Sequence, residues 1–274
     1  INRLFNDIWF LIFFVLLLSA LFTQLISKSK RLFRIFLRLD KKRNIRILWI
    51  GIIIYIIFFG ITSILQHYAL NTHAEDLGMF TQVIWNSIHG NIAYTTLKHE
   101  CFFKEHFALI YVIISPLYFI FDSPVTLLVI QTIILALTAL PIYYIAKLKL
   151  QSSFAALVLS LSYLFCTHIH CANLFDFHQE IFEGFLILSA FYMMLKYKGA
   201  KLWLSWVLFL LAFSCKEDVG LNVIPLALLL IFNEKKKIGW LLLIVSISWF
   251  VIATNYIIPL YNSPAERHIF FAVR

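Results

Sequence analysis

The stretch LWLSWVLFLLAFSCKEDVGLNVIPLALLLIF, residues 202–232, sets the fold class, because a charged triplet stands between two uninterrupted apolar runs. The runs 202–214 and 219–232 would each form about 20 Å of helix, whereas the hydrocarbon core of a bilayer is about 30 Å thick. Charged backbone at such a depth is tolerated only inside protein or beside a wet cavity. Lys216-Glu217-Asp218 is therefore predicted to point outward yet lie below the membrane surface.

The composition of the whole chain supports this interpretation. Apolar residues make up 62%, charged residues 14%, and the mean hydropathy is +0.87. These values predict an all-α integral membrane protein, since a soluble domain is nearer half apolar and a quarter charged. The net charge of +9 comes mostly from short basic segments between apolar runs. That pattern fits cytoplasmic loops and anionic headgroups, so we expect a lipid bilayer as partner and no nucleic acid.

The apolar runs predict a polytopic helix bundle of about eight spans. Nine basic residues between 28 and 46, followed by lysines at 147–149, 196–201 and 235–237, mark cytoplasmic segments. The run 106–121 has only 16 residues and contains Pro116, so we expect an interfacial or re-entrant helix on the outer side. One large exterior loop, 67–124, follows, with 167–180 outside as well. The eight predicted spans are 8–26, 47–66, 125–146, 153–172, 181–197, 202–214, 219–232 and 238–258.

Two regions are expected along the chain. Residues 1–46 form an extra N-terminal span with a basic cytoplasmic loop, and residues 47–274 form the main transmembrane domain. The chain begins without methionine and ends in Phe270-Phe271-Ala272-Val273-Arg274, so we expect a fragment that lacks its C-terminal part.

The first group of candidate site residues lies at the start of the exterior loop. Thr72-x-x-Glu75 resembles a capping box and Gly90 a helix stop, which predicts an amphipathic helix over 72–90. Glu75 is then a cap or a catalytic residue. Asp76 lies at the edge of the apolar face, where it is either a functional base or a favourable charge at the helix N-terminus.

A second group lies in Asn173-Leu174-Phe175-Asp176-Phe177-His178-Gln179-Glu180. Asp176-x-x-Gln179 resembles another helix start, which would place Asp176, Glu180 and Glu183 on one helix face. A capping role explains only the first of these, so the others favour a site. The triplet 216–218 is the third group, read as a site or as an internal Lys–Glu pair that closes a helix break.

These motifs carry a family resemblance. Residues 75–86 (Glu-Asp-Leu-Gly-Met-Phe-x-Gln-x-x-Trp-Asn), 173–180 and 216–219 (Lys-Glu-Asp-Val), with 123–131 and 140–143 between them, resemble a prokaryotic membrane family catalogued as domain of unknown function 2079. That family in turn looks like the GT-C glycosyltransferases, which implies an exterior loop with juxtamembrane helices. By this resemblance Asp76 occupies the position of the catalytic carboxylate, and Lys216 that of a lysine near the lipid phosphate. The segment 1–46 departs from the GT-C pattern, and the C-terminal soluble domain of many such enzymes is absent from this chain.

The resemblance implies transfer of a sugar from a polyprenyl-phosphate-linked donor to an envelope acceptor, at the exterior or periplasmic face of the prokaryotic cytoplasmic membrane. Asp76 would be the general base, with Glu75, Asp176 and Glu180 as further catalytic candidates. The residues expected to bind the lipid phosphate or substrate are Lys216, His178, Glu217, Asp218, His73 and His106. A divalent metal (magnesium, manganese or zinc) could be held by Asp76 and Asp176 with His178 or Glu180.

Two other functional classes remain open from the sequence. A transporter or flippase would line a path with its charges, although charges along helix centres and an inverted repeat are expected of that class and are not evident. A non-catalytic scaffold for envelope assembly would use the charged groups only as structural pairs.

Overall fold

The chain folds into a bundle of antiparallel helices that is covered at one end by a layer of short elements. The computed structural model describes residues 41–232 and 235–262. By length and composition three helices in these ranges can cross a membrane: Lys42–Tyr68, Pro124–Leu150 and Lys236–Tyr261. The pair Ser153–Leu164 and Thr167–Leu174, bent by 43°, makes a fourth if it counts as one span. The expected helical membrane protein is thus confirmed.

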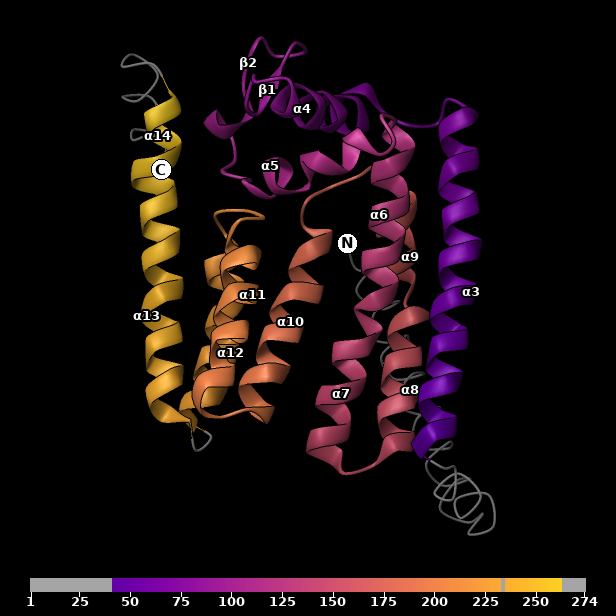
Figure 1. Ribbon diagram of the computed structural model, residues 1–274, viewed down its shortest axis with the longest axis vertical. Helices are drawn as coiled ribbons and strands as arrows, with labels where there is room; N and C mark the ends of the chain where they lie inside the picture. Colours follow the sequence, from indigo (N-terminus) through magenta and orange to yellow (C-terminus); the bar gives the residue numbers. More distant parts are fainter. Residues whose placement is uncertain (1–40, 233–234, 263–274) are drawn as a thin grey trace, which may run out of the picture.

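Successive passes of the bundle run in opposite directions, and α3 and α13 stand at its two edges (Figure 1). The turns between α7 and α8, α10 and α11, and α12 and α13 all lie at the end where α3 begins. These are the lysine-rich turns, so the basic segments gather at one end, as the sequence predicts. The passes are α3 (Lys41–Tyr68), α6 (Pro124–Leu137) with α7 (Ala139–Leu150), α8 (Ser153–Leu164) with α9 (Thr167–Leu174), α10 (Ile181–Lys196), η4 (Gly199–Leu202) with α11 (Trp203–Phe213), α12 (Val219–Phe232), and α13 (Lys236–Ile252) with η5 (Ala253–Ile257) and α14 (Ile258–Tyr261).

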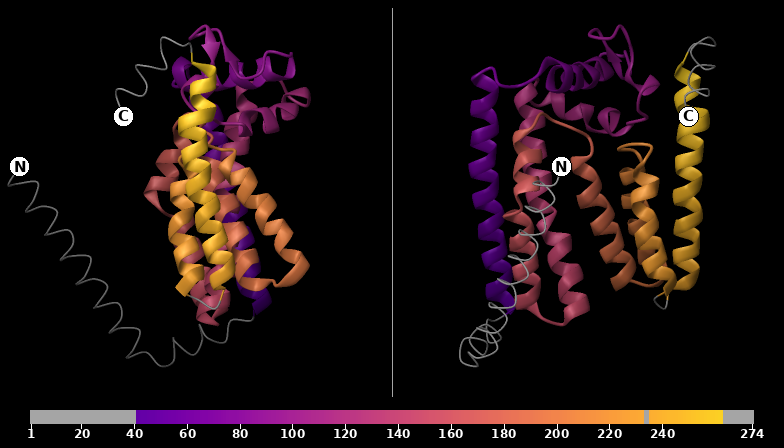
Figure 2. Two further views of the ribbon diagram at one scale, coloured as in Figure 1. Left: turned by 90° about the vertical axis from the view of Figure 1, so that its left-hand side faces the viewer. Right: turned by 180° about the vertical axis from the view of Figure 1, so that it is seen from behind.

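A layer formed by residues 74–119, which we call the cap, covers the opposite end of the bundle (Figures 1 and 2). In it α4 and α5 lie across the bundle axis, so the run 106–121 does not traverse the bundle, as expected. Gln82 Oε1 on α4 accepts hydrogen bonds from Thr95 and Thr96, which fastens the hairpin of the cap. The elements of the cap are η1 (Ala74–Gly78), α4 (Met79–Ile88), β1 (Tyr94–Thr95), β2 (Glu100–Cys101), η2 (Phe102–Lys104), α5 (Ile110–Ile114) and η3 (Ser115–Phe119).

A capped helix start follows the cap. The Ser123 hydroxyl accepts a hydrogen bond from the Val125 N–H, and Pro124 occupies the first helical position of α6. Proline is suited to this position because its missing N–H would have no partner there.

The hairpin of α11 and α12 stops beneath the cap, whereas α3 extends to the level of the cap, and so does α13 through its continuation in η5 and α14 (Figure 1). The backbone N–H of Ile110 in α5 donates to the Ser214 carbonyl at 2.8 Å, which joins the underside of the cap to the turn at 214–218. The charged triplet at 216–218 therefore lies below the cap-side end of the long helices, in keeping with its short flanking runs.

The buried core is divided into two parts. One part lies between α3, α6, α7 and α8 and includes Tyr55 and Tyr143. The other lies between the cap and α10 to α13, where Phe80, Tyr111 and Phe177 pack against one another. Helix α10 contacts α6 and α7 and so joins the two parts.

The expected eight crossings are reproduced only in part. The first, 8–26, and most of segment 1–46 lie outside the described residues. The other seven correspond in position to helical passes, but α10, α11 and α12 contain only 16, 11 and 14 residues. A full span needs about 20 residues.

Candidate functional site

Three segments that are far apart in the sequence meet beneath the cap. They are 73–76 at the start of the cap, the non-helical stretch 175–180 between α9 and α10, and the turn 214–218 between α11 and α12. Four pairs of side chains join these segments to one another or to the rest of the cap: His73–Asp176, Asp76–His178, Glu180–Lys216 and His106–Glu217. The structure thus brings together the three groups that the sequence singles out.

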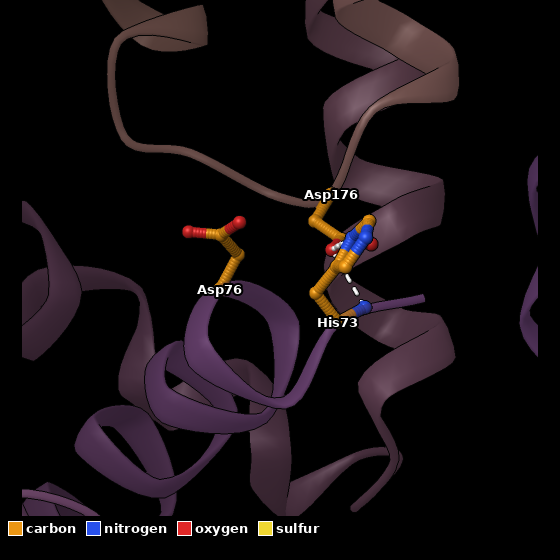
Figure 3. A group of neighbouring side chains, drawn as sticks. All are labelled: His73, Asp76 and Asp176. Carbon is orange, nitrogen blue, oxygen red and sulfur yellow. Dashed lines mark hydrogen bonds and ion pairs between the residues drawn. The ribbon is translucent and has the colours of Figure 1, made fainter. Parts of the chain in front are cut away.

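Asp176 fastens the start of the cap. Its side chain is only 4% exposed, and Oδ2 accepts hydrogen bonds from the backbone N–H and from Nδ1 of His73, both at 2.8 Å. Figure 3 shows this pair with Asp76 beside it. A buried carboxylate needs such donors because desolvation of the charge is otherwise costly.

Asp76 lies in the π-helical turn η1 and faces the same space. Its side chain is 29% exposed, and Oδ1 lies 3.6 Å from Nε2 of His178. The carboxylate points away from its own helix, toward the segment that carries Asp176 (Figure 3). The neighbouring Glu75 is exposed, and no ion pair of the described residues includes it. Of the two carboxylates, Asp76 is the one that joins the site.

The predicted capping box is wrong. The helical turn begins at Ala74, with His73 in the N-cap position, and the Thr72 hydroxyl lies 3.1 Å from Nδ1 of His67 instead. The hydrogen bonds between His73 and Asp176 determine where this helix starts, and they outweigh the local capping signal. The predicted end of the helix is correct, since Gly90 adopts a left-handed conformation with φ +92°.

The expected common helix face of Asp176, Glu180 and Glu183 is also wrong, because α10 begins only at Ile181. Gln131 explains the difference. Its Nε2 donates to the carbonyls of Ala172, Asn173 and Phe175, and its Oε1 accepts from the His178 N–H. These bonds hold the end of α9 and the non-helical residues 175–178, so that Asp176 turns toward the cap.

His73, Asp76 and Asp176 form a group that fits a metal ion, because one ligand atom from each lies within 4.8 Å of the others. This set differs from the predicted one, in which His178 or Glu180 completes the pair of aspartates. His178 is held beside the group, with Nδ1 2.9 Å from the Asp176 carbonyl. One imidazole and two carboxylates suit zinc or manganese, and the carboxylates also suit magnesium.

Lys216 pairs with Glu180 across the gap between the 175–180 stretch and the turn. The distance from Nζ to Oε1 is 2.7 Å, and Asp218 Oδ2 lies 3.9 Å from the same ammonium. Burial alone lowers the pKa of Lys216, but the hydrogen bond and charge of Glu180, with the charges of Asp218 and Glu217, outweigh it and raise the pKa. The ammonium is therefore charged at neutral pH.

Glu217 connects the same turn to the cap instead of pairing with Lys216. Its buried carboxylate accepts from Nδ1 of His106 at 2.9 Å and from the Phe107 N–H at 3.2 Å. Burial raises the pKa of Glu217, but these hydrogen bonds and the nearby His106 lower it below its ordinary value overall. The internal Lys–Glu pair considered for the triplet is therefore not formed by Lys216 and Glu217, and the glutamate that Lys216 contacts is Glu180.

More carboxylate oxygens surround Lys216 than one ammonium can satisfy. Glu180 Oε2, Glu183 Oε1 and Asp218 Oδ1 are buried and meet no hydrogen-bond donor in the described part of the chain. Glu183 has one bond, from Nδ2 of Asn222 at 3.2 Å. Unsatisfied buried acceptors are costly, so this part of the site can accept a proton, a cation or a hydrogen-bond donor.

Sequence reasoning missed two residues that build the site, Gln131 and Tyr111. Gln131 stands inside an apolar span and ends the 123–131 motif, which is a signal that could have identified it. Tyr111 is fully buried, stacks on Phe80 and donates from its hydroxyl to Oε1 of Gln179. Nothing in its local sequence distinguishes it from the other tyrosines.

A cavity of about 580 Å³ opens beside the site, between α6, α9 and the start of α10. Its lining combines apolar side chains with the polar groups of the stretch 175–180. The lining residues are Gln131, Leu135, Cys171, Ala172, Phe175, Asp176, His178, Glu180 and Ile181. This arrangement can hold an amphipathic molecule whose polar part lies against His178 and Glu180.

A comparison with protein-family models matches residues 66–271 to a family described as "Predicted membrane protein (DUF2079)". No curated protein and no solved structure matches the chain.

Proposed function

The chain belongs to the DUF2079 family of predicted membrane proteins, and we propose that it transfers a sugar from a polyprenyl-phosphate-linked donor to an envelope acceptor. One observation carries the proposal: a largely apolar cavity between helices is lined by His178 and Glu180, which pair with Asp76 and Lys216 respectively. A lipid-linked sugar has the same division between a long apolar chain and a charged head.

The site lies at the end of the bundle opposite the lysine-rich turns (Figure 1). Because lysine-rich turns are typical of the cytoplasmic side, the site is assigned to the exterior or periplasmic face. The lipid chain of the donor would enter sideways between the helices, along Leu135, Phe175 and Ile181 of the cavity. Its phosphate would then approach Lys216 and His178.

The transfer follows from the charges at the site. The carboxylate of Asp76 takes the proton of an acceptor hydroxyl as that oxygen bonds to the anomeric carbon of the sugar. The bond from the anomeric carbon to the phosphate oxygen breaks, and its electron pair leaves with the polyprenyl phosphate. Lys216 stabilises the negative charge that gathers on the phosphate, since a nearby cation is worth most where charge develops.

His73, Asp76 and Asp176 would hold a divalent metal if the enzyme uses one. Such an ion would supply positive charge beside the departing phosphate. His73 and Asp176 already lie in hydrogen-bond contact, so the two ligands are positioned in advance.

The test uses the purified full chain, reconstituted with synthetic polyprenyl-phosphate hexoses and pentoses as donors. Membrane extract is added as a source of acceptors, and the release of polyprenyl phosphate is measured. Asp76→Asn should lower the rate by about 100-fold or more. Glu75→Gln is the matched control and should leave the rate unchanged, because that carboxylate is exposed and outside the site. If Asp76→Asn and Lys216→Ala both keep the rate of the unchanged chain, the proposal fails.

The unsatisfied carboxylates around Lys216 favour one other candidate, a cation- or proton-coupled transporter. Glu183 lies in α10 with only Asn222 as a described hydrogen-bond partner, and an intramembrane carboxylate of this kind is typical of ion pathways. A transporter should dissipate an imposed pH gradient in proteoliposomes, and Glu183→Gln should abolish that flux. A transferase keeps the gradient in both forms.

A further inference from the structure

A second cavity, of about 530 Å³, lies at the lysine-rich end, far from the site described above. It is enclosed by the turn between α10 and α11 on one side and by the first turn of α13 on the other. Four of its lining residues are lysines. The lining consists of Tyr197, Lys198, Gly199, Leu202, Lys235, Lys236, Lys237 and Ile238.

The positive charge of this cavity is largely unbalanced. Segments 196–201 and 233–237 together contain six lysines and one acid, Glu234, which lies outside the described residues. Within the described ranges no carboxylate forms an ion pair with any of these lysines. Burial, and then the charge of Lys198, lower the pKa of Lys235, as expected where ammonium groups face one another.

The lysines of the cavity differ in what they contact. Lys235 donates to the carbonyls of Met194, Leu195 and Tyr197 and so closes the carboxyl end of α10. Lys198, Lys236 and Lys237 have no such described bond. These three ammonium groups are therefore available to a ligand.

Backbone N–H groups at helix starts add to the positive potential of the cavity. Both α13 and the helical stretch that starts with η4 begin at this cavity, and neither has an acidic residue in its first turn. The first N–H groups of a helix have no intrahelical partner and carry partial positive charge, which favours an anion. Lysine side chains and helix starts thus act on the same space.

Two tryptophans place the cavity at the membrane interface. Trp203 opens α11, and Trp240 lies just beyond the first turn of α13; both are exposed, at 63% and 55%. Exposed tryptophan is enriched at the level of the lipid headgroups. We therefore expect a ligand that comes from the bilayer and not from free solution.

We propose that this cavity binds the phosphate-bearing headgroup of an anionic phospholipid in the leaflet at the lysine-rich end. Basic pockets between transmembrane helices on this side recognise such headgroups, and each lysine close to the surface contributes measurably to the attraction. The proposal is independent of the transferase activity, because no residue of the cavity belongs to the outer site.

The test is a titration of the purified full chain in neutral detergent with dihexanoyl-phosphatidylglycerol, followed by native mass spectrometry. Dihexanoyl-phosphatidylcholine and inorganic phosphate serve as comparison ligands. The triple variant Lys198→Gln, Lys236→Gln, Lys237→Gln should weaken binding of phosphatidylglycerol by about tenfold or more. Lys235 is left in place because it closes α10.

The matched control removes three charges from the same end of the bundle but away from the cavity: Arg43→Gln, Arg46→Gln, Lys149→Gln. This variant should bind phosphatidylglycerol as the unchanged chain does. Equal weakening in both triple variants would show general surface attraction and overturn the proposal. Equal binding of phosphatidylcholine would overturn it too, and inorganic phosphate binding as tightly as phosphatidylglycerol would exclude the lipid as the source.

Discussion

At the scale of single residues, the Gln131 side chain holds a whole backbone segment of the site in place. It is fully buried, and its amide makes four hydrogen bonds to the backbone of 172–178. Through them it places both Asp176 and His178, and it also lines the cavity beside them. Gln131 is thus a positioning residue. Its neighbour Thr132 in α6 is equally buried, but the described hydrogen bond of its hydroxyl stays within the helix and goes to the Leu128 carbonyl.

We expect Gln131→Leu to destabilise the protein by about 1–3 kcal/mol or more, because each buried group left unsatisfied carries a cost of that order. Thermal unfolding of the purified chain in detergent measures the loss. Thr132→Val should change the unfolding temperature little, because the deleted bond is local. Equal unfolding temperatures for Gln131→Leu and Thr132→Val would show that the 172–178 stretch is held by other contacts.

The residue scale also shows where sequence reasoning stops. The acidic and basic residues of the site were identifiable, because charges next to apolar runs need a partner or a function. Their pairing was not, because His73 and Asp176 are 103 residues apart and His106 and Glu217 are 111 apart. Local signals such as Thr72-x-x-Glu75 then suggested helix starts that the distant contacts override.

At the scale of elements, α12 and α13 share the most extensive contact among the described helices, and glycine permits it. A Cβ on Gly220 would lie 2.4 Å from the Ser246 carbonyl oxygen of α13. A Cβ on Gly239 would lie 2.7 Å from the backbone nitrogen of Ile231 in α12. Small residues at such crossings let two helices in a membrane approach closely.

Gly220→Ala should therefore force the two helices apart and destabilise the protein by about 1–3 kcal/mol. Gly60→Ala in α3 is the matched control, because its Cβ would meet only the Thr132 methyl group at an ordinary 3.9 Å. That variant should be neutral or slightly stabilising, since alanine favours helix more than glycine. The unfolding temperatures of both variants test this prediction. A Gly220→Ala chain as stable as the Gly60→Ala chain would contradict the close crossing of α12 and α13.

At the scale of the whole molecule, the basic turns and the charged site lie at opposite ends of the bundle (Figure 1). This arrangement was predictable, because lysine and arginine set orientation and the short run 106–121 could be excluded as a crossing. The division of the core into two parts was not predictable. It depends on which apolar faces meet, and fully apolar helices give no periodic signal of that.

The orientation can be tested by labelling single cysteines in a cysteine-free chain with a membrane-impermeant maleimide. Asn91→Cys, in the exposed hairpin region of the cap, should react in intact cells. Gln151→Cys, in the exposed turn between α7 and α8, should react only after the membrane is opened. The opposite pattern would place the site on the cytoplasmic side.

The long separation of the paired charges has a consequence for biosynthesis. His73 leaves the ribosome 103 residues before Asp176, a delay of about 5–20 s at ~5–20 residues per second. During that interval several helices must enter the bilayer while His73 lacks its partner Asp176. The ends of the cap and the turn at 216–218 can join only after α11 has been inserted, so the site is completed among the last steps of insertion.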